Sequence, residues 1–215
     1  MSLRESFCIY VIAGVNGGGK SSLAGATMRE LGGLYYNPDE VARRLMTRHP
    51  DLRQREANQA AWEQGVRLLK RAIQEHLTFA FETTLGGSTI SRLLLQAARE
   101  GGAIHVWYVG LSNPELHLAR VRGRVARGGH DISEADIRRR YEHSRVNLIA
   151  LLPHLTSLRL FDNSIDADPA EGHTPSPQLL LHMEQRRILA PADLSRTPNW
   201  AKPIVAAALK LAQFE

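Results

Sequence analysis

Short apolar runs alternate with longer amphipathic segments along the first 165 residues of the chain. Residues 7–13 are apolar throughout and end at Gly14, a pattern typical of a strand that is buried on both faces of a parallel sheet. The same pattern predicts four further strands, at 34–36, 78–81, 103–109 and 157–162.

Segments of helical composition separate these strands, and several have recognisable starts. Pro114 follows Asn113 at the start of one helix, and Ser133 can cap the start of another. The predicted helices lie at 20–31, 39–48, 51–76, 88–99, 114–127 and from 133 onward. Strands joined by helices of this length form parallel sheets with helices on both faces. The pattern therefore predicts a three-layer α/β fold with a mostly parallel sheet of about five strands.

The last fifty residues have a different character. Six of the ten prolines lie between Pro169 and Pro203. Apolar residues at 179–183 and 188–189 predict a short hairpin, and those at 204–211 predict a closing helix. We therefore expect a core at 1–165 and a C-terminal extension at 166–215 that packs on the core.

Composition excludes several classes of protein. With 43% hydrophobic and 23% charged residues, the chain can bury a sizeable core and is not predominantly disordered. No apolar run reaches 18 residues, so no membrane span is expected, and the first residues lack the cleavage site of a signal peptide. Cys8 is the single cysteine, which excludes a disulfide framework and favours a reduced, cytoplasmic protein.

Residues 14–21 read G-V-N-G-G-G-K-S and match the phosphate-binding pattern G-x-x-x-x-G-K-[ST] of a P-loop, or Walker A motif. A predicted strand enters this loop and a predicted helix leaves it, as a P-loop requires. Glycines allow consecutive backbone N–H groups to face phosphate oxygens, Lys20 can reach the β- and γ-phosphates, and the Ser21 hydroxyl can ligate Mg²⁺. We expect ATP to contact Gly14, Asn16, Gly17, Gly18, Gly19, Lys20, Ser21 and Ser22.

A P-loop is shared by kinases, GTPases and motor ATPases, and the chain lacks the further motifs of the last two. No strand of four apolar residues ends in Asp-Glu, no second ATPase signature is found, and no N-K-x-D motif is present. A kinase is therefore favoured over a motor ATPase or a GTPase.

Polar residues follow the predicted strands at the edge where open α/β sheets bind ligands. Asp39 follows the second strand, and Glu82, Thr83 and Thr84 follow the third. A carboxylate at this edge can accept the proton of a substrate hydroxyl as that hydroxyl attacks the γ-phosphate. Two structural interpretations stay open: Asp39 can cap a helix, and Glu82 can bind a nearby backbone amide.

The net charge is +5, and residues 117–145 hold eight arginines against four acids. Arginine binds phosphate oxygens in a planar, bidentate manner, and Gly128 and Gly129 can act as hinges, so this segment is predicted to be a mobile lid. It holds more arginines than one ATP needs, so we expect an anionic acceptor. A solvated helix face is the alternative for about half of these arginines. Nucleic-acid binding is disfavoured because basic and aromatic residues are not interleaved.

Four motifs in the right order resemble the zeta-toxin family, and more narrowly its stand-alone, zeta-toxin-like branch. They are the loop at 14–22, N-P-D-E at 37–40, F-A-F-E-T-T-L at 79–85, and G-G-H at 128–130 with I-R-R-R-Y at 137–141. The resemblance implies a P-loop kinase that uses ATP and Mg²⁺ to phosphorylate a hydroxyl of UDP-N-acetylglucosamine. It also implies that a small antitoxin protein can be a partner.

The resemblance also implies roles for particular residues. Asp39 takes the place of the base, and Glu82 takes that of an acid at the substrate site. The lid arginines of the family fall between residues 120 and 140, where we select Arg124, Arg139 and Arg140. The prediction is thus an ATP-dependent phosphotransferase with an alcohol acceptor. Its alternatives are a metabolic or nucleoside kinase on the same scaffold and a non-enzymatic nucleic-acid-binding protein switched by ATP.

Overall fold

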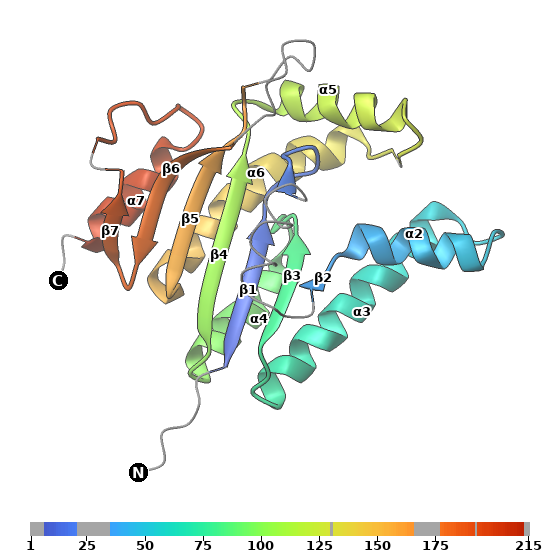
Figure 1. Ribbon diagram of the computed structural model, residues 1–215, viewed down its shortest axis with the longest axis horizontal. Helices are drawn as coiled ribbons and strands as arrows, with labels where there is room; N and C mark the ends of the chain where they lie inside the picture. The colour runs from blue at the N-terminus through green and yellow to red at the C-terminus, as the bar shows by residue number, and fades with distance from the viewer. Residues whose placement is uncertain (1–6, 21–34, 130, 166–176, 192, 213–215) are drawn as a thin grey trace.

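The computed structural model describes residues 7–20, 35–129, 131–165, 177–191 and 193–212. A single seven-stranded sheet has the order β2-β3-β1-β4-β5-β6-β7 (Figure 1). Its parallel part consists of β1 (Cys8–Ala13), β2 (Tyr35–Tyr36), β3 (Phe79–Thr83), β4 (Ala103–Gly110) and β5 (Ser157–Asp162). The α/β fold with a mostly parallel sheet is confirmed, and these five strands lie where the apolar runs predict them.

Helices connect the parallel strands, and some of them begin at a side chain that caps the first turn. Asn37 accepts hydrogen bonds from the N–H groups of Asp39 and Glu40, and Asn113 accepts one from that of Leu116. The helices are α2 (Pro38–Arg48), α3 (Gln54–Gln74), α4 (Ser88–Arg99), α5 (Pro114–Val125), α6 (Glu134–Leu151) and α7 (Lys202–Ala212), with a 3₁₀ turn η1 (Leu152–His154). The helix predicted at 20–31 lies outside the described residues apart from Lys20.

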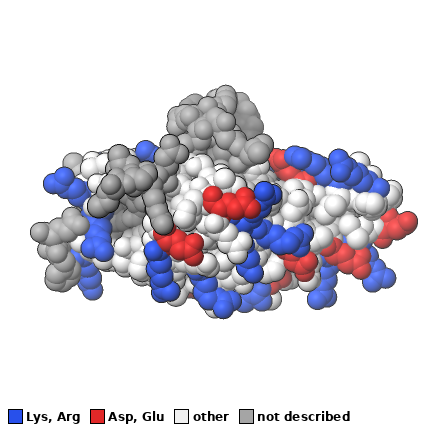
Figure 2. Space-filling model, turned by 90° about the horizontal axis from the view of Figure 1, so that it is seen from below, with Lys and Arg blue, Asp and Glu red and all other residues white. Residues whose placement is uncertain are grey.

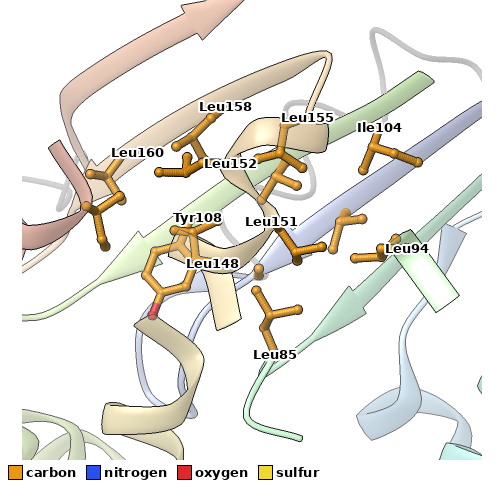
Figure 3. Packing of buried hydrophobic residues seen from close by; sticks show 14 of the residues in the cluster. Leu85, Leu94, Ile104, Tyr108, Leu148, Leu151, Leu152, Leu155, Leu158 and Leu160 are labelled. Carbon is orange, nitrogen blue, oxygen red and sulfur yellow. The ribbon is translucent and has the colours of Figure 1, made fainter. Parts of the chain in front are cut away.

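The main hydrophobic core lies on one face of the sheet, where alternate strand residues meet α3, α4, α6 and α7. In Figure 1, α4, α6 and α7 lie behind the sheet. Figure 3 shows leucines of α6 and of the turn that follows packing against Ile104, Tyr108, Leu158 and Leu160 of β4 and β5. Ile12 and Trp107 form a separate, smaller cluster that includes Tyr10 and Phe161. Within the described residues, no helix is both long and apolar enough to cross a membrane.

The predicted C-terminal hairpin continues the sheet as two antiparallel strands. They are β6 (Gln178–Glu184), which pairs with β5, and β7 (Arg187–Ala190). Leu181 and Met183 of β6 belong to the same core cluster as Val11 of β1, and so does Trp200, which precedes α7. The extension and the parallel part of the sheet therefore share one core.

Candidate active site

The phosphate loop leaves β1 at the carboxyl end of the parallel strands, and its glycines have backbone angles that favour glycine. The φ angles of Gly14, Gly17 and Gly19 are +138°, +81° and +89°. A Cβ on Gly14 would lie 2.2 Å from the carbonyl oxygen of Val109 on β4. The loop therefore has the close approach and the turned amides that a phosphate cradle requires. Ser21 and Ser22, predicted to bind Mg²⁺ and phosphate, lie outside the described residues.

Asn163, just after β5, holds the phosphate loop from the side. Its Nδ2 donates to the carbonyl oxygen of Gly18 at 3.0 Å, and its own carbonyl accepts from Arg120 Nη2 at 2.8 Å. A Cβ on Gly19 would lie 2.3 Å from Asn163 Nδ2, so the phosphate loop and the segment after β5 pack closely only because residue 19 is glycine. Trp200 Nε1 donates to the neighbouring Asp162 Oδ1 at 3.3 Å, which ties the C-terminal extension to this corner.

Two side chains from α5 and α6 contact Asn16, in the middle of the loop. His117 Nδ1 lies 2.9 Å from the Asn16 carbonyl oxygen, and Arg140 Nη1 donates to Asn16 Oδ1 at 2.7 Å. Burial lowers the pKa of the Arg140 guanidinium, which nevertheless stays charged. Because a carbonyl can only accept, His117 Nδ1 carries the proton and Nε2 the lone pair. Nε2 is buried and has no hydrogen-bond partner among the residues that the structure describes.

The burial of His117 should make the stability of the fold depend on pH. Burial is the largest cause that lowers its pKa, from 6.5 to about 4, and the charges of Lys20 and Arg120 lower it further. Between pH 6.5 and about 4, His117 binds a proton in the unfolded chain but not in the folded chain. The contribution of neutral His117 is therefore complete above pH 6.5 and is lost as the pH falls toward 4, by up to about 3 kcal/mol.

Urea unfolding between pH 7.5 and 4 measures this contribution. In His117→Asn, the amide can still donate to Asn16, but no group titrates. The free energy of unfolding of this variant should fall with decreasing pH by about 3 kcal/mol less than that of the wild type. Parallel curves for the two proteins would show that His117 does not titrate in this way.

Lys20 and Glu82 form a buried pair between the phosphate loop and the end of β3. Lys20 Nζ lies 3.5 Å from Glu82 Oε1, and both side chains are 8% exposed. The other carboxylate oxygen, Oε2, accepts from Tyr35 Oη at 2.7 Å and from Asn37 Nδ2 at 2.9 Å. Burial and the charge of Glu82 raise the pKa of Tyr35, so its hydroxyl remains a donor. Among the described residues, Glu82 is therefore fixed by side-chain donors and not by a backbone amide, and it can orient Lys20.

Asp39 lies in the first turn of α2, and Asn37 is the residue that caps this helix. The Asp39 side chain is half exposed, and Asp39 Oδ2 lies 3.9 Å from Arg124 Nη1 of α5. The interpretation of Asp39 as the helix cap is therefore wrong, because the Asn37 oxygen occupies the capping position. Its carboxylate is accessible to a ligand and next to a cation.

Asn16, Lys20, Asp39 and Glu82 line one cavity of about 350 Å³ at the carboxyl ends of the strands. Thr83 and Thr84 line it too, but Thr83 Oγ1 accepts from the N–H of Leu85 and Thr84 Oγ1 from that of Gly86. The two threonines therefore shape the turn after β3. The residues that line the cavity include Asn16, Lys20, Asp39, Asn58, Trp62, Glu82, Thr83, Thr84, Thr89, Ile90, Asp131, Ile132, Asp136 and Arg140.

The arginines of residues 117–145 are distributed differently from the prediction. Arg140 and Arg124 lie at the site, whereas Arg139 is 59% exposed and donates to Asp136 Oδ1 at 2.6 Å. The structure thus does not bring Arg139 to the phosphate loop, because it lies on the solvent side of α6. Two further arginines pair with acids of α5 and α6: Arg138 with Glu115 and Glu134, and Arg145 with Glu142.

Parts of the predicted lid are built into the core. His117, Leu118 and Val121 of α5 are buried, as are Ile137 and Tyr141 of α6. A lid movement that leaves the core intact is therefore confined to residues 122–136. His130, the third residue of the G-G-H motif, lies outside the described residues.

Four residues at the site, Tyr35, Asn37, His117 and Asn163, were not predicted to have a role there. Asn37 had a visible signal, since it precedes Pro38 at the start of a predicted helix, as capping residues do. Asn163 had a weaker one, because it follows a predicted strand at the ligand-binding edge. Tyr35 and His117 had none, because their partners are distant in sequence.

Fold and site together define a P-loop kinase-like protein. The chain belongs to the AAA domain family, whose model matches residues 9–144. An uncharacterized protein of Haemophilus influenzae is 32% identical over 128 residues, which are 60% of this chain and 88% of that protein.

Two solved structures share the fold at low sequence identity. The AvrRxo1-ORF1:ORF2 complex with ATP has a TM-score of 0.65 at 12% identity, over 94% of this chain and 64% of that chain. The PezAT chromosomal toxin-antitoxin system of Streptococcus pneumoniae has a TM-score of 0.54 at 13% identity, over 100% of this chain and 88% of that chain. They support a broad P-loop kinase fold.

Proposed function

We propose that the protein transfers the γ-phosphate of ATP to a hydroxyl group of a small molecule. The observation that carries this proposal is that Lys20 of the phosphate loop and the accessible carboxylate of Asp39 line the same cavity. A cation for the phosphates and a base for the attacking hydroxyl are thus within one site. This is the minimum that phosphoryl transfer by a kinase requires.

Each residue has a part in the proposed reaction. The amides of the loop and Lys20 bind the phosphates of ATP, and Glu82 keeps Lys20 directed at them. Asp39 accepts the proton of the acceptor hydroxyl, while Arg140 and Arg124 stabilise the charge that develops on the transferred group. Mg²⁺, when bound, would neutralise part of the phosphate charge. Ser21 is the proposed protein ligand for this ion, and the described residues contain no cluster of three or more carboxylate, imidazole or thiolate groups that could hold a metal.

The acceptor that the zeta-toxin resemblance implies is UDP-N-acetylglucosamine, and it is the first compound to test. With γ-labelled ATP and Mg²⁺, an acceptor should become labelled and ADP release should rise at least about tenfold above hydrolysis without acceptor. The panel adds free N-acetylglucosamine, uridine and myo-inositol. Arg124→Ala and Glu82→Ala should lose this stimulation before they lose ATP binding. Label found only in inorganic phosphate with every compound would contradict phosphotransfer and indicate an ATPase.

Two further features bear on partners. The two similar folds come from the AvrRxo1-ORF1:ORF2 complex and the PezAT toxin-antitoxin system, so a small antitoxin-like partner is part of the proposal. In Figure 2, which views the amino ends of the parallel strands, Lys and Arg side chains are interspersed with Asp and Glu. Such a face does not favour the alternative of a nucleic-acid-binding switch.

A further inference from the structure

One face of α3 forms the wall of the cavity that faces the phosphate loop. Asn58, Trp62, Gly65 and Val66 recur at helical spacing and all line the cavity. Trp62 is 47% exposed, whereas Trp107 and Trp200 are 7% and 4% exposed. An indole that the core does not bury, on the wall of a cavity, is available to cover a ligand.

The helix α3, which carries Trp62, is packed against its neighbours both before and after this residue. Ala57 and Ala61 are fully buried against α2, and Tyr36 donates a hydrogen bond to the Ala61 carbonyl oxygen. Gly65 allows the Tyr36 ring to lie against the helix, since a Cβ there would be 2.8 Å from Tyr36 Cε1. The indole is therefore presented by a rigid element and is not on a loose loop.

Asn58 lies one helical turn before Trp62, on the same wall. Its Oδ1 accepts from Gln54 Nε2 at 2.8 Å, which fixes the amide with its amino group directed away from that contact. Within the described part of the chain, this amino group donates no hydrogen bond. An indole face beside a free amide donor is a combination that suits a ring with hydroxyl groups.

The charges around the cavity are unequally placed. Its described lining contains two cations, and both point toward the phosphate loop: Lys20 contacts Glu82 and the Val15 carbonyl, and Arg140 contacts Asn16. The other charged groups of the described lining are acids, Asp39, Glu82, Asp131 and Asp136, of which Asp136 pairs with Arg139 and Asp39 lies beside Arg124. A diphosphate beside Asp131 and Asp136 would therefore meet more carboxylates than free cations. The volume of about 350 Å³ is also at the small end of the range of about 300–1,000 Å³ for ligand pockets.

We infer, given the proposed phosphotransfer, that the acceptor is an uncharged ring compound with hydroxyl groups, such as a sugar, a cyclitol or a nucleoside. Its ring lies on the Trp62 indole and accepts a hydrogen bond from the Asn58 amide, and one hydroxyl reaches Asp39. Of the eight arginines in residues 117–145, Arg138, Arg139 and Arg145 pair with neighbouring acids, so fewer arginines can meet an anionic acceptor than the sequence suggests.

The test measures binding and requires no turnover. With ADP and Mg²⁺ saturating the phosphate loop, acrylamide quenching of tryptophan fluorescence is followed while ring compounds are added. The probes are matched pairs with and without a diphosphate: N-acetylglucosamine with UDP-N-acetylglucosamine, and uridine with UDP, together with myo-inositol. At least one uncharged ring should protect the quenchable tryptophan, and its charged counterpart should bind at least about tenfold more weakly.

Tryptophan variants show which indole gives the quenching signal. Trp62→Phe should remove the quenchable signal but keep ring affinity, measured by calorimetry, within about threefold, and Trp62→Ala should weaken binding about three- to tenfold. Trp107→Phe, which removes a buried indole, is the matched control and should change neither. Protection by none of the uncharged rings, tighter binding of the diphosphates, or unchanged affinity in Trp62→Ala would each overturn the inference. Ring binding with no transfer of label from ATP would instead leave the ring site in place and refute the proposed reaction.

Discussion

Replacing Asp39 by Asn should lower kcat with the true acceptor about 10²- to 10⁴-fold while ATP binding stays within a few-fold of the wild type. The amide has the shape of the carboxylate but cannot accept the hydroxyl proton. The helix should not be affected, because Asn37 and not Asp39 caps α2. The exposed contact with Arg124 contributes at most about 1 kcal/mol to folding, so the unfolding midpoint should barely move.

Glu40→Gln provides the matched control for this result. Glu40 is the next residue of the same helical turn, pairs with Arg44 at 3.1 Å and is not part of the cavity lining. Steady-state kinetics with acceptor and calorimetric titration with ATP separate transfer from binding. If Asp39→Asn turns over like Glu40→Gln, then Asp39 is not the base.

Replacing Gly14 by Ala should destabilise the whole fold by about 3 kcal/mol or more. The new Cβ would lie 2.2 Å from the Val109 carbonyl oxygen, and the φ of +138° is one that alanine rarely adopts. Relief would require β1 and β4 to separate at the centre of the sheet. Because folding free energies are about 5–15 kcal/mol, this loss should be evident in urea unfolding.

Gly123→Ala is the control for a glycine without such a constraint. Gly123 lies inside α5, and a Cβ there would meet no heavy atom within 4 Å. Alanine should raise stability by about 0.5–1 kcal/mol through its higher helix propensity. A Gly14→Ala protein as stable as the wild type would mean that the phosphate loop is not held against β4 as described.

The features predicted correctly from the sequence depend on local patterns. The apolar runs of β1 and β5, the phosphate loop and the starts of α5 and α6 each have their signal within a few residues. Glu82 and Asp39 were placed at the same site because parallel strands end at the same edge of a sheet. No knowledge of distant partners was needed for that step.

The features that were missed depend on contacts between distant elements. Tyr35 reaches Glu82 across 47 positions, and His117 reaches Asn16 across 101. Composition could not show which arginines of α5 and α6 lie at the site, because each of them can pair either with a nearby acid or with a group of the site. Only the direction of each side chain distinguishes Arg140 from its neighbour Arg139.

The hydrogen bond from Trp200 to Asp162 extends the support of the phosphate loop into the C-terminal part of the chain. The family match ends at residue 144, yet Asn163, which holds Gly18, comes after it, and the indole that braces Asp162 comes later still. Gly110 leaves room for that indole, since a Cβ there would be 2.2 Å from it. A chain cut at the family boundary would lose β5, β6, β7 and α7, the core residues that they contribute, and the contact of Asn163 with the phosphate loop. The folded unit that supports the phosphate loop is therefore longer than the segment that the family model matches.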